Sequence, residues 1–272
     1  MRKKTADTWL KALSYIFLIL ISAAMLLPFY WMIISSVKSS SELSQLPPTL
    51  FPVDPQPDNY STILAKLPLL RYFFNSVAVA LGSTVLILIT STFCAFAMAF
   101  YTFPGRKLLL SAILITTGIP FEVMVITNYS TVIQLGWNDN LIALILPYAG
   151  NLIYTYMLYI RFRETTSGIY RAARADGASK LVFLLRILIP STTPLLLVFF
   201  LFNFISSWNS FMWPMLVLKS SENRTLPFAL YAFMTEGGER FELMMAMSVI
   251  LLSPLLLIFV CFRKTITKQQ LQ

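Results

Sequence analysis

Apolar runs of about 20 residues recur along the chain and constrain its fold more than any other feature. A helix of that length rises about 30 Å, which matches the hydrocarbon core of a bilayer. The runs lack the ten-residue alternation of a membrane β-barrel, and backbone groups in lipid must bond within the spanning structure. We therefore predict an all-α polytopic membrane protein with six transmembrane helices, at residues 13–34, 77–101, 108–133, 141–160, 192–217 and 243–262.

The composition agrees with a chain that folds in lipid. Only 12% of the 272 residues are charged and 57% are hydrophobic, whereas about a quarter of a soluble domain is charged. Histidine is absent, and Cys94 and Cys261 both lie inside apolar runs. The sequence also lacks the glycine-rich phosphate loop that ends in Gly-Lys-Ser/Thr. These features predict no enzyme activity, no metal site and no cofactor bound by this chain.

The basic residues are distributed unevenly between the two sides that six spans define. One side holds 15 of the 21 Lys and Arg residues, in the N-terminal segment 1–12, the loop near Arg106, the loop 161–190 and the tail 263–272. The opposite side holds eight of the 12 acidic residues. The positive-inside rule then predicts a multi-pass protein of the cell (inner or plasma) membrane with both termini cytoplasmic. The net charge of +9 is accounted for by this topology and predicts no nucleic-acid partner.

The loop 161–190 is the most informative polar segment, because it places charge between two strongly apolar runs. Its first helical stretch brings Ala172, Ala173 and Asp176 to one face and ends at Gly177, where the backbone bends. A second helical stretch then leads to the next span. This pattern predicts a cytoplasmic helix-turn-helix with one face small enough for another surface to approach closely. From the residues alone, an ordinary basic loop is the alternative.

Several motifs carry a resemblance to a known family. Ala-Ala-x-x-Asp-Gly-Ala-Ser at 172–179, with Ile-Leu-Ile-Pro at 187–190, resembles the "EAA" loop of ABC importer permeases. The motifs at 135–140 and 208–209 resemble the carbohydrate-uptake, maltose-system-like branch of these binding-protein-dependent inner-membrane components. The resemblance extends over about residues 10–262. It implies a transmembrane permease domain over 13–262, between the cytoplasmic end segments.

The resemblance also implies a coupling site, since in this family the loop forms a helix that docks in a cleft of the ATPase subunit. Carried over residue by residue, the site consists of Arg171, Ala172, Ala173, Asp176, Gly177, Ala178 and Pro190. The family's glutamate before the two alanines is Arg171 here. A compensating acidic group on the partner ATPase is therefore expected.

What the resemblance implies about function is a permease subunit of an ATP-driven importer for an oligosaccharide or related carbohydrate. The implied partners are two ATPase subunits that bind ATP and Mg, a second related permease chain and an extracytoplasmic solute-binding protein. Two alternatives stay open: an ABC permease for a non-sugar solute, and a stand-alone secondary transporter. The second alternative needs charged groups paired within the membrane, and Glu122 is the sole candidate for such a group.

Candidate residues of a substrate pathway are polar or aromatic side chains within the predicted spans. Amide and hydroxyl groups bond to sugar hydroxyls, and aromatic rings pack against the sugar ring. The alternative is structural, because polar residues also bond between membrane helices and aromatic residues gather at membrane interfaces. The candidates are Glu122, Asn151, Tyr154, Asn203, Trp208 and Asn209.

Overall fold

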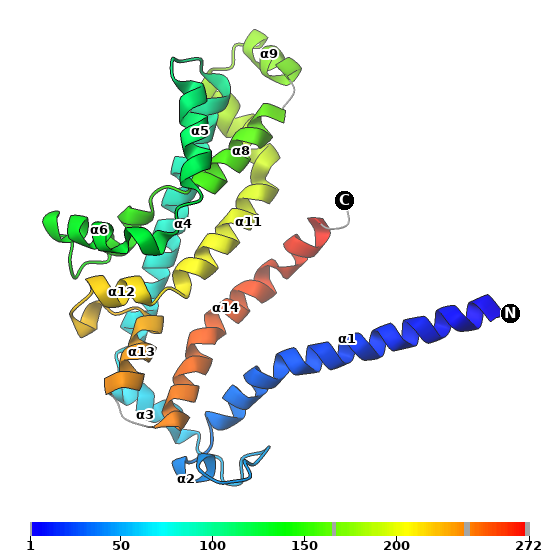
Figure 1. Cartoon of the computed structure of the whole chain (residues 1–272), viewed down its shortest axis with the longest axis vertical. Helices are drawn as coiled ribbons and strands as arrows, with labels where there is room; N and C mark the ends of the chain where they lie inside the picture. Colours follow the sequence, from blue (N-terminus) through cyan, green and yellow to red (C-terminus); the bar gives the residue numbers. More distant parts are fainter. Residues whose placement is uncertain (1, 165–166, 237–239, 270–272) are drawn as a thin grey trace. The chain divides into compact units, whose positions relative to one another are not determined.

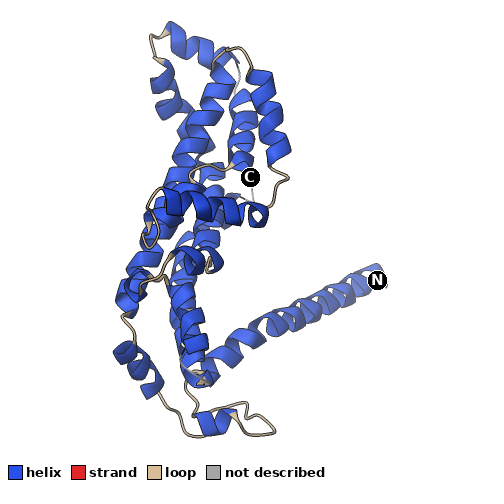
Figure 2. Cartoon of the chain, turned by 60° about the vertical axis from the view of Figure 1, so that its left-hand side comes forward, coloured by secondary structure: helices blue, strands red, loops and turns tan. Residues whose placement is uncertain are grey.

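The computed structural model describes residues 2–164, 167–236 and 240–269, and all regular structure in these ranges is helical (Figures 1 and 2). The elements are, in chain order, α1 (Arg2–Ser35), α2 (Ser40–Leu43), α3 (Asp58–Lys66), α4 (Leu69–Phe100), α5 (Arg106–Thr116), α6 (Phe121–Gln134), α7 (Ile142–Ile145), the 3₁₀ turn η1 (Leu146–Tyr148), α8 (Leu152–Glu164), α9 (Ser167–Ala175), α10 (Lys180–Phe183), the π-helical segment η2 (Leu184–Leu188), α11 (Ile189–Trp208), α12 (Met212–Val217), the 3₁₀ turn η3 (Ser221–Asn223), α13 (Leu226–Glu236) and α14 (Phe241–Gln269).

Four described helices are long and apolar enough to cross a membrane: Leu13–Ser35, Leu69–Phe100, Lys180–Trp208 and Phe241–Val260. The pair Ile142–Tyr148 and Leu152–Glu164 is a fifth candidate, bent by 45° at a short break. The described helices therefore supply four or five candidate spans, where the apolar runs predict six.

The predicted span 108–133 accounts for the difference, because two shorter helices occupy it. Helix α5 ends at Thr116 and α6 begins at Phe121. Pro120 separates them, since proline lacks an amide hydrogen and disfavours helical backbone at the residue before it. The hydroxyls of Thr116 and Thr117 also donate to carbonyls of the preceding turn, at 2.7 Å to Ala112 and 2.6 Å to Leu114.

The predicted span 192–217 is also divided, here into α11 and α12. A regular helix through this region would bring the ring of Pro214 against the carbonyl of Ser210. The chain instead leaves the helix after Trp208 and starts again at Met212. At its other end, α11 continues from the wide π-helical turns of η2, which accommodate the missing amide hydrogen of Pro190.

The chain divides into two compact units, residues 1–68 with 230–263, and residues 69–229 with 264–272. In the first unit, the segment after α1 is ordered by buried polar groups. The Asn59 side-chain amide donates to the carbonyls of Ser36 and Lys38, each at 3.0 Å. Glu42, only 5% exposed, accepts from the Thr49 hydroxyl at 2.5 Å. This proline-rich segment is therefore a folded structure and not a loose connection.

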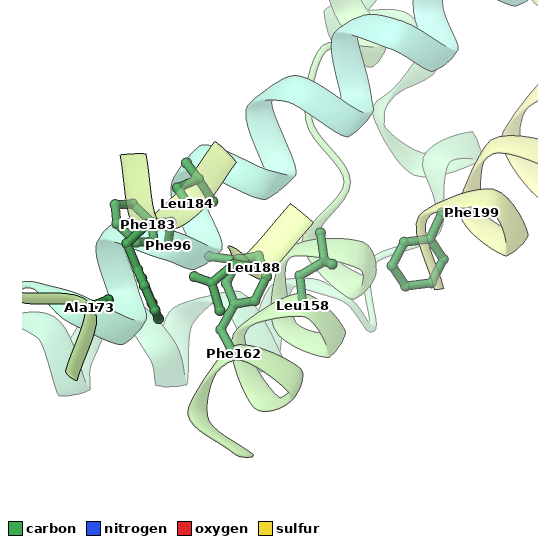
Figure 3. Close-up of a cluster of buried hydrophobic side chains, with 9 residues drawn as sticks. Phe96, Leu158, Phe162, Ala173, Phe183, Leu184, Leu188 and Phe199 are labelled. Carbon is green, nitrogen blue, oxygen red and sulfur yellow. The ribbon is translucent and has the colours of Figure 1, made fainter. Parts of the chain in front are cut away.

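The second unit is built on α4, which packs along α8 and α11 (Figure 1). A cluster of buried side chains fills the space between these helices at the end nearest the 161–190 loop (Figure 3). Its members are Ala95, Phe96, Leu158, Phe162, Ala173, Phe183, Leu184, Leu188 and Phe199. Because α9, α10 and η2 all contribute side chains, the loop is fixed to the helices of its own unit.

Candidate functional site

Helix α9 ends in a geometry that depends on Gly177. This glycine has φ +81°, a left-handed conformation that side chains with a Cβ disfavour. Two backbone bonds close the helix end, from the Ala178 amide to the Ala173 carbonyl at 2.9 Å and from Gly177 to Arg174 at 3.2 Å. This is the Schellman arrangement, which satisfies carbonyls that a helix end leaves open. Ser179 then begins α10, its hydroxyl accepting from the Val182 amide at 3.2 Å.

One face of α9 lies against the core of the unit. Tyr170 packs between Phe100 and Phe183, with ring centroids 5.1 and 5.0 Å away. Ala173 is 8% exposed and belongs to the same buried cluster. The sequence predicts that Ala173 shares an outward face with Ala172, and the structure places it inward. The inward turn follows from Tyr170, whose large ring sits three residues earlier and directs that side of the helix to the core.

The outward surface of the loop carries most of the remaining coupling-site candidates. Arg171, Ala172, Asp176 and Gly177 are exposed, Ala178 is half-buried and Pro190 is exposed at the start of α11. A Cβ added at Gly177 would meet no atom within 4 Å. The turn between α9 and α10 is therefore a small, open and conformationally defined surface to which a partner can approach closely.

A cavity of about 430 Å³ lies elsewhere in the same unit, between α4, η1, α11 and α12. It brings together three of the predicted pathway residues: Asn203, Trp208 and Asn209. The full lining is Ser76, Val79, Ser83, Leu144, Tyr148, Asn203, Ser206, Ser207, Trp208, Asn209, Ser210, Phe211, Met212, Trp213, Pro214 and Thr225. The break between α11 and α12 supplies much of this wall, so the interruption of the predicted span creates the cavity's surface.

Hydrogen bonds between helices hold the cavity walls in place. The Asn203 amide donates to the Thr84 hydroxyl at 2.9 Å, and Ser83 donates to Ser207 at 3.0 Å, which ties α4 to α11. The Trp213 indole donates to the Ala143 carbonyl at 2.9 Å. Lipid hydrocarbon has no groups that could replace these hydrogen bonds, so the polar side chains can fix the distance between helices.

Two lining groups are buried without a hydrogen-bond partner among the described residues: the Trp208 indole N–H and the Thr225 hydroxyl. Native structures leave few buried polar groups unpaired. Both groups belong to residues that line the cavity, but the atoms themselves are buried beneath its surface.

The other predicted pathway residues do not line this cavity. Asn151 directly precedes α8, and its side-chain oxygen accepts from the Tyr154 amide at 3.0 Å. The ring of Tyr154 stacks on Phe199 with centroids 4.2 Å apart and 8° between planes, so it packs in the core. Glu122 stands at the start of α6, and its side chain lies outside the described part of the structure.

Sequence reasoning missed the contribution of Ser76 and Ser83 on α4 and of Phe211 in the break after α11. The serines recur every seven residues, which keeps them on one helix face, and that spacing was the available signal. Nothing in the sequence marks Phe211, because its place depends on where the helix is interrupted. Within the described residues, no three His, Cys, Asp or Glu side chains gather closely enough to hold a metal ion.

Asp139 ties together two connecting loops of the second unit, before α7 and after α12. Its side-chain oxygen accepts from the amides of Lys219 and Ser220, both at 3.0 Å, and from the Ser220 hydroxyl at 3.0 Å. The Asn223 amide donates to the Asp139 carbonyl at 2.6 Å. Asp139 has φ +58°, a conformation that aspartate and asparagine tolerate better than most residues.

We expect the Asp139→Asn variant to be less stable by about 1 kcal/mol, because charge-assisted bonds are stronger than neutral ones. Desolvation alone would raise the pKa of Asp139, but the bonds from Ser220, Lys219 and Asn223 outweigh it and hold the pKa below its ordinary value. The native stabilisation is therefore complete above the ordinary carboxyl pKa and is lost as pH falls through the lowered one. Thermal unfolding of the purified protein against pH measures this, and an equal acid response in the variant would contradict it.

Comparisons with known proteins extend over nearly the whole chain. The model of the family described as binding-protein-dependent transport system inner membrane component matches residues 87–270. The arabinooligosaccharides transport system permease protein AraQ of Bacillus subtilis is 30% identical over 92% of this chain and 90% of its own length. The diacetylchitobiose uptake system permease protein NgcG of Streptomyces coelicolor is 28% identical over 96% of this chain and 88% of its own.

Two solved structures share the fold. A chain of a bacterial ABC transporter involved in import of the acidic polysaccharide alginate superposes with a TM-score of 0.82 at 22% identity, over 95% of this chain and 97% of that one. A chain of the bacterial alginate ABC transporter in complex with an alginate pentasaccharide-bound periplasmic protein gives a TM-score of 0.68 at 13% identity, over 97% and 96%.

Proposed function

The chain belongs to the family of binding-protein-dependent transport system inner membrane components, and on that basis we propose that it forms part of the pathway by which an ATP-driven importer admits a carbohydrate. It is a membrane-embedded transport subunit, and ATP hydrolysis belongs to a separate chain. The observation that carries the carbohydrate assignment is the match to AraQ, a permease for arabinooligosaccharides, over 92% of this chain. The match to a diacetylchitobiose permease agrees with it.

The turn between α9 and α10 is the proposed contact with the ATPase. Its outward residues are small or polar, and its inward face is held by Tyr170 and Ala173. Because α9 is packed against the buried cluster, a displacement of the turn would also displace the helices that contribute side chains to this cluster. ATP binding would close two ATPase subunits, draw the turns with them and shift the spans from inward-open to outward-open. The ATPase subunits would bind ATP and Mg, and this chain would bind neither of them. Such a shift requires different affinities for the two states.

The cavity lined by α4, α11 and α12 is the proposed part of the substrate pathway contributed by this chain. Asn203, Trp208 and Asn209 combine amide groups with an aromatic wall, which suits a solute with many hydroxyls. Its volume of about 430 Å³ falls within the range of small-molecule sites, about 300–1,000 Å³. Asn151 and Tyr154 have structural roles in α8 and are not assigned to the pathway.

The remaining partners follow from the family and from the charge pattern. A solute-binding protein would dock on the acid-rich outer segments 35–70 and 218–242. A second, related permease would complete the pathway, as two permease chains are usual in carbohydrate systems. The distribution of the basic residues supports a cytoplasmic location of both termini and of the 161–190 loop, on the side where an ATPase could reach the loop.

The test is purification of this chain from its native membranes in mild detergent, with mass spectrometry of the stoichiometric partners. We expect an ATPase and a second permease, with a sugar-binding protein retained after cross-linking. A control purification from a strain that lacks the chain removes nonspecific proteins. Recovery of the chain alone or as a homo-oligomer would contradict the importer assignment and favour a stand-alone transporter.

A further inference from the structure

The lining of the cavity contains no charged side chain. All 16 residues that form it are described, and none is Asp, Glu, Lys or Arg. Its polar side-chain groups are the hydroxyls of the serines, Thr225 and Tyr148, the amides of Asn203 and Asn209, and the indole N–H groups of Trp208 and Trp213. The 21 basic residues of the chain therefore all lie outside this lining.

An uncharged cavity discriminates strongly between neutral and anionic solutes. Moving a carboxylate or phosphate out of water carries a large free-energy penalty unless a cation accompanies it. A sugar hydroxyl loses far less, because one or two hydrogen bonds replace those it made to water. The solved relative of this fold imports alginate, an acidic polysaccharide, while the relative AraQ is a permease for arabinooligosaccharides. The absence of charge in the lining is therefore relevant to the difference between similar proteins that transport acidic saccharides and those that transport other saccharides.

The two amides of the lining also match hydroxyls better than they match anions. Asn203 donates one N–H to Thr84 at 2.9 Å, and Asn209 donates one to the Ile205 carbonyl at 2.9 Å. Each amide keeps a carbonyl oxygen and a second N–H for a guest. A hydroxyl can donate to that oxygen and accept from the N–H. A carboxylate only accepts, and the carbonyl oxygen repels it.

We propose that the cargo passing this chain is an uncharged, polyhydroxylated oligosaccharide and that the cavity excludes acidic and phosphorylated sugars. This inference rests on the proposed function. Phe211, 43% exposed, adds an apolar surface for the C–H face of a sugar ring.

The test compares a wild-type strain with one that lacks the chain, each fed two oligosaccharide pools. The neutral pool contains partial hydrolysates of arabinan, starch and chitin, and the acidic pool contains those of alginate and polygalacturonate. We expect chain-dependent depletion of a component of the neutral pool and none of the acidic pool. Chain-dependent depletion of an acidic oligosaccharide would overturn the inference and leave the carbohydrate function intact. Depletion of neither pool would count against the carbohydrate function itself.

A pair of variants ties the result to the cavity. Ser206 lines the cavity, whereas Thr102 lies outside it in the connection between α4 and α5, and both residues are exposed. We expect Ser206→Lys to lower uptake of the depleted neutral sugar about tenfold, because it places an unpaired cation in the path, and Thr102→Lys to leave uptake unchanged. Equal amounts of both variants in the membrane fraction control for folding. Unchanged uptake in the Ser206→Lys strain would show that the cargo does not pass this cavity.

Discussion

Replacing Gly177 with glutamate is expected to abolish ATP-driven uptake while the chain still inserts into the membrane and assembles. A glutamate at φ +81° carries a backbone penalty of roughly 1–2 kcal/mol. Its side chain meets no atom of this chain within 4 Å of the Cβ, so the folded unit can accommodate it. It projects instead into the open space in front of the α9–α10 turn, where the ATPase is proposed to dock. Uptake in proteoliposomes and recovery of the chain from membranes are the two measurements.

Gly105 provides a matched control for that variant. It has φ +83°, and a Cβ added there would also meet no atom within 4 Å, but it stands at the start of α5. Gly105→Glu therefore adds the same charge and a similar backbone penalty outside the coupling turn. We expect it to retain most of the uptake. If the two variants lose uptake equally, backbone strain or charge explains the loss and the coupling assignment fails. Gly177→Asn, which tolerates a left-handed backbone, separates strain from side-chain bulk.

The class of fold was predictable because it depends on the length and polarity of segments. Apolar runs of about 20 residues indicate membrane helices whatever their partners, and the long helices α1, α4 and α14 fall on three of the predicted runs. The interruptions were less predictable. Pro120 and Pro214 were visible, yet proline is tolerated in many membrane helices, because neighbouring groups can satisfy the freed carbonyl. Whether a proline divides a span depends on local packing, and the spacing of apolar residues along the sequence gives no information about that packing.

The candidate sites were predictable in composition but not in orientation. Small residues near 172–178 indicated a close-approach surface, and the exposed turn around Gly177 agrees with that composition. The inward position of Ala173 depends on Tyr170, Phe100 and Phe183 meeting across three helices. Likewise, the assembly of the cavity depends on bonds between α4 and α11, more than a hundred residues apart in sequence. Contacts between residues so far apart in the chain cannot be read from a single sequence, because they form only when the helices pack.

The Phe183→Ala variant is expected to separate ATP hydrolysis from uptake, because Phe183 joins α9 to the rest of its unit. The side chain is fully buried and contacts the rings of Tyr170 and Phe100, with centroids 5.0 and 5.4 Å away. Removing a buried phenylalanine typically costs about 3–5 kcal/mol, part of which falls on the seating of α9. A loss of about 1.4 kcal/mol in that seating changes the ratio of seated to unseated turns tenfold.

A turn whose helix α9 has lost its packing against the cluster can still contact the ATPase. Its displacement, however, no longer moves the helices that Phe183 connects. We therefore expect Phe183→Ala to lower uptake at least about tenfold, with a smaller change in ATP hydrolysis by the reconstituted complex and a lower unfolding temperature. Leu185→Ala is the control, since Leu185 lies two residues away and is 50% exposed, and it should retain both activities. Phe183→Leu should recover part of the uptake, because it refills most of the lost volume. Parallel losses of hydrolysis and uptake in Phe183→Ala, with normal membrane content, would mean that the turn acts only as a docking surface and that its rigidity does not matter.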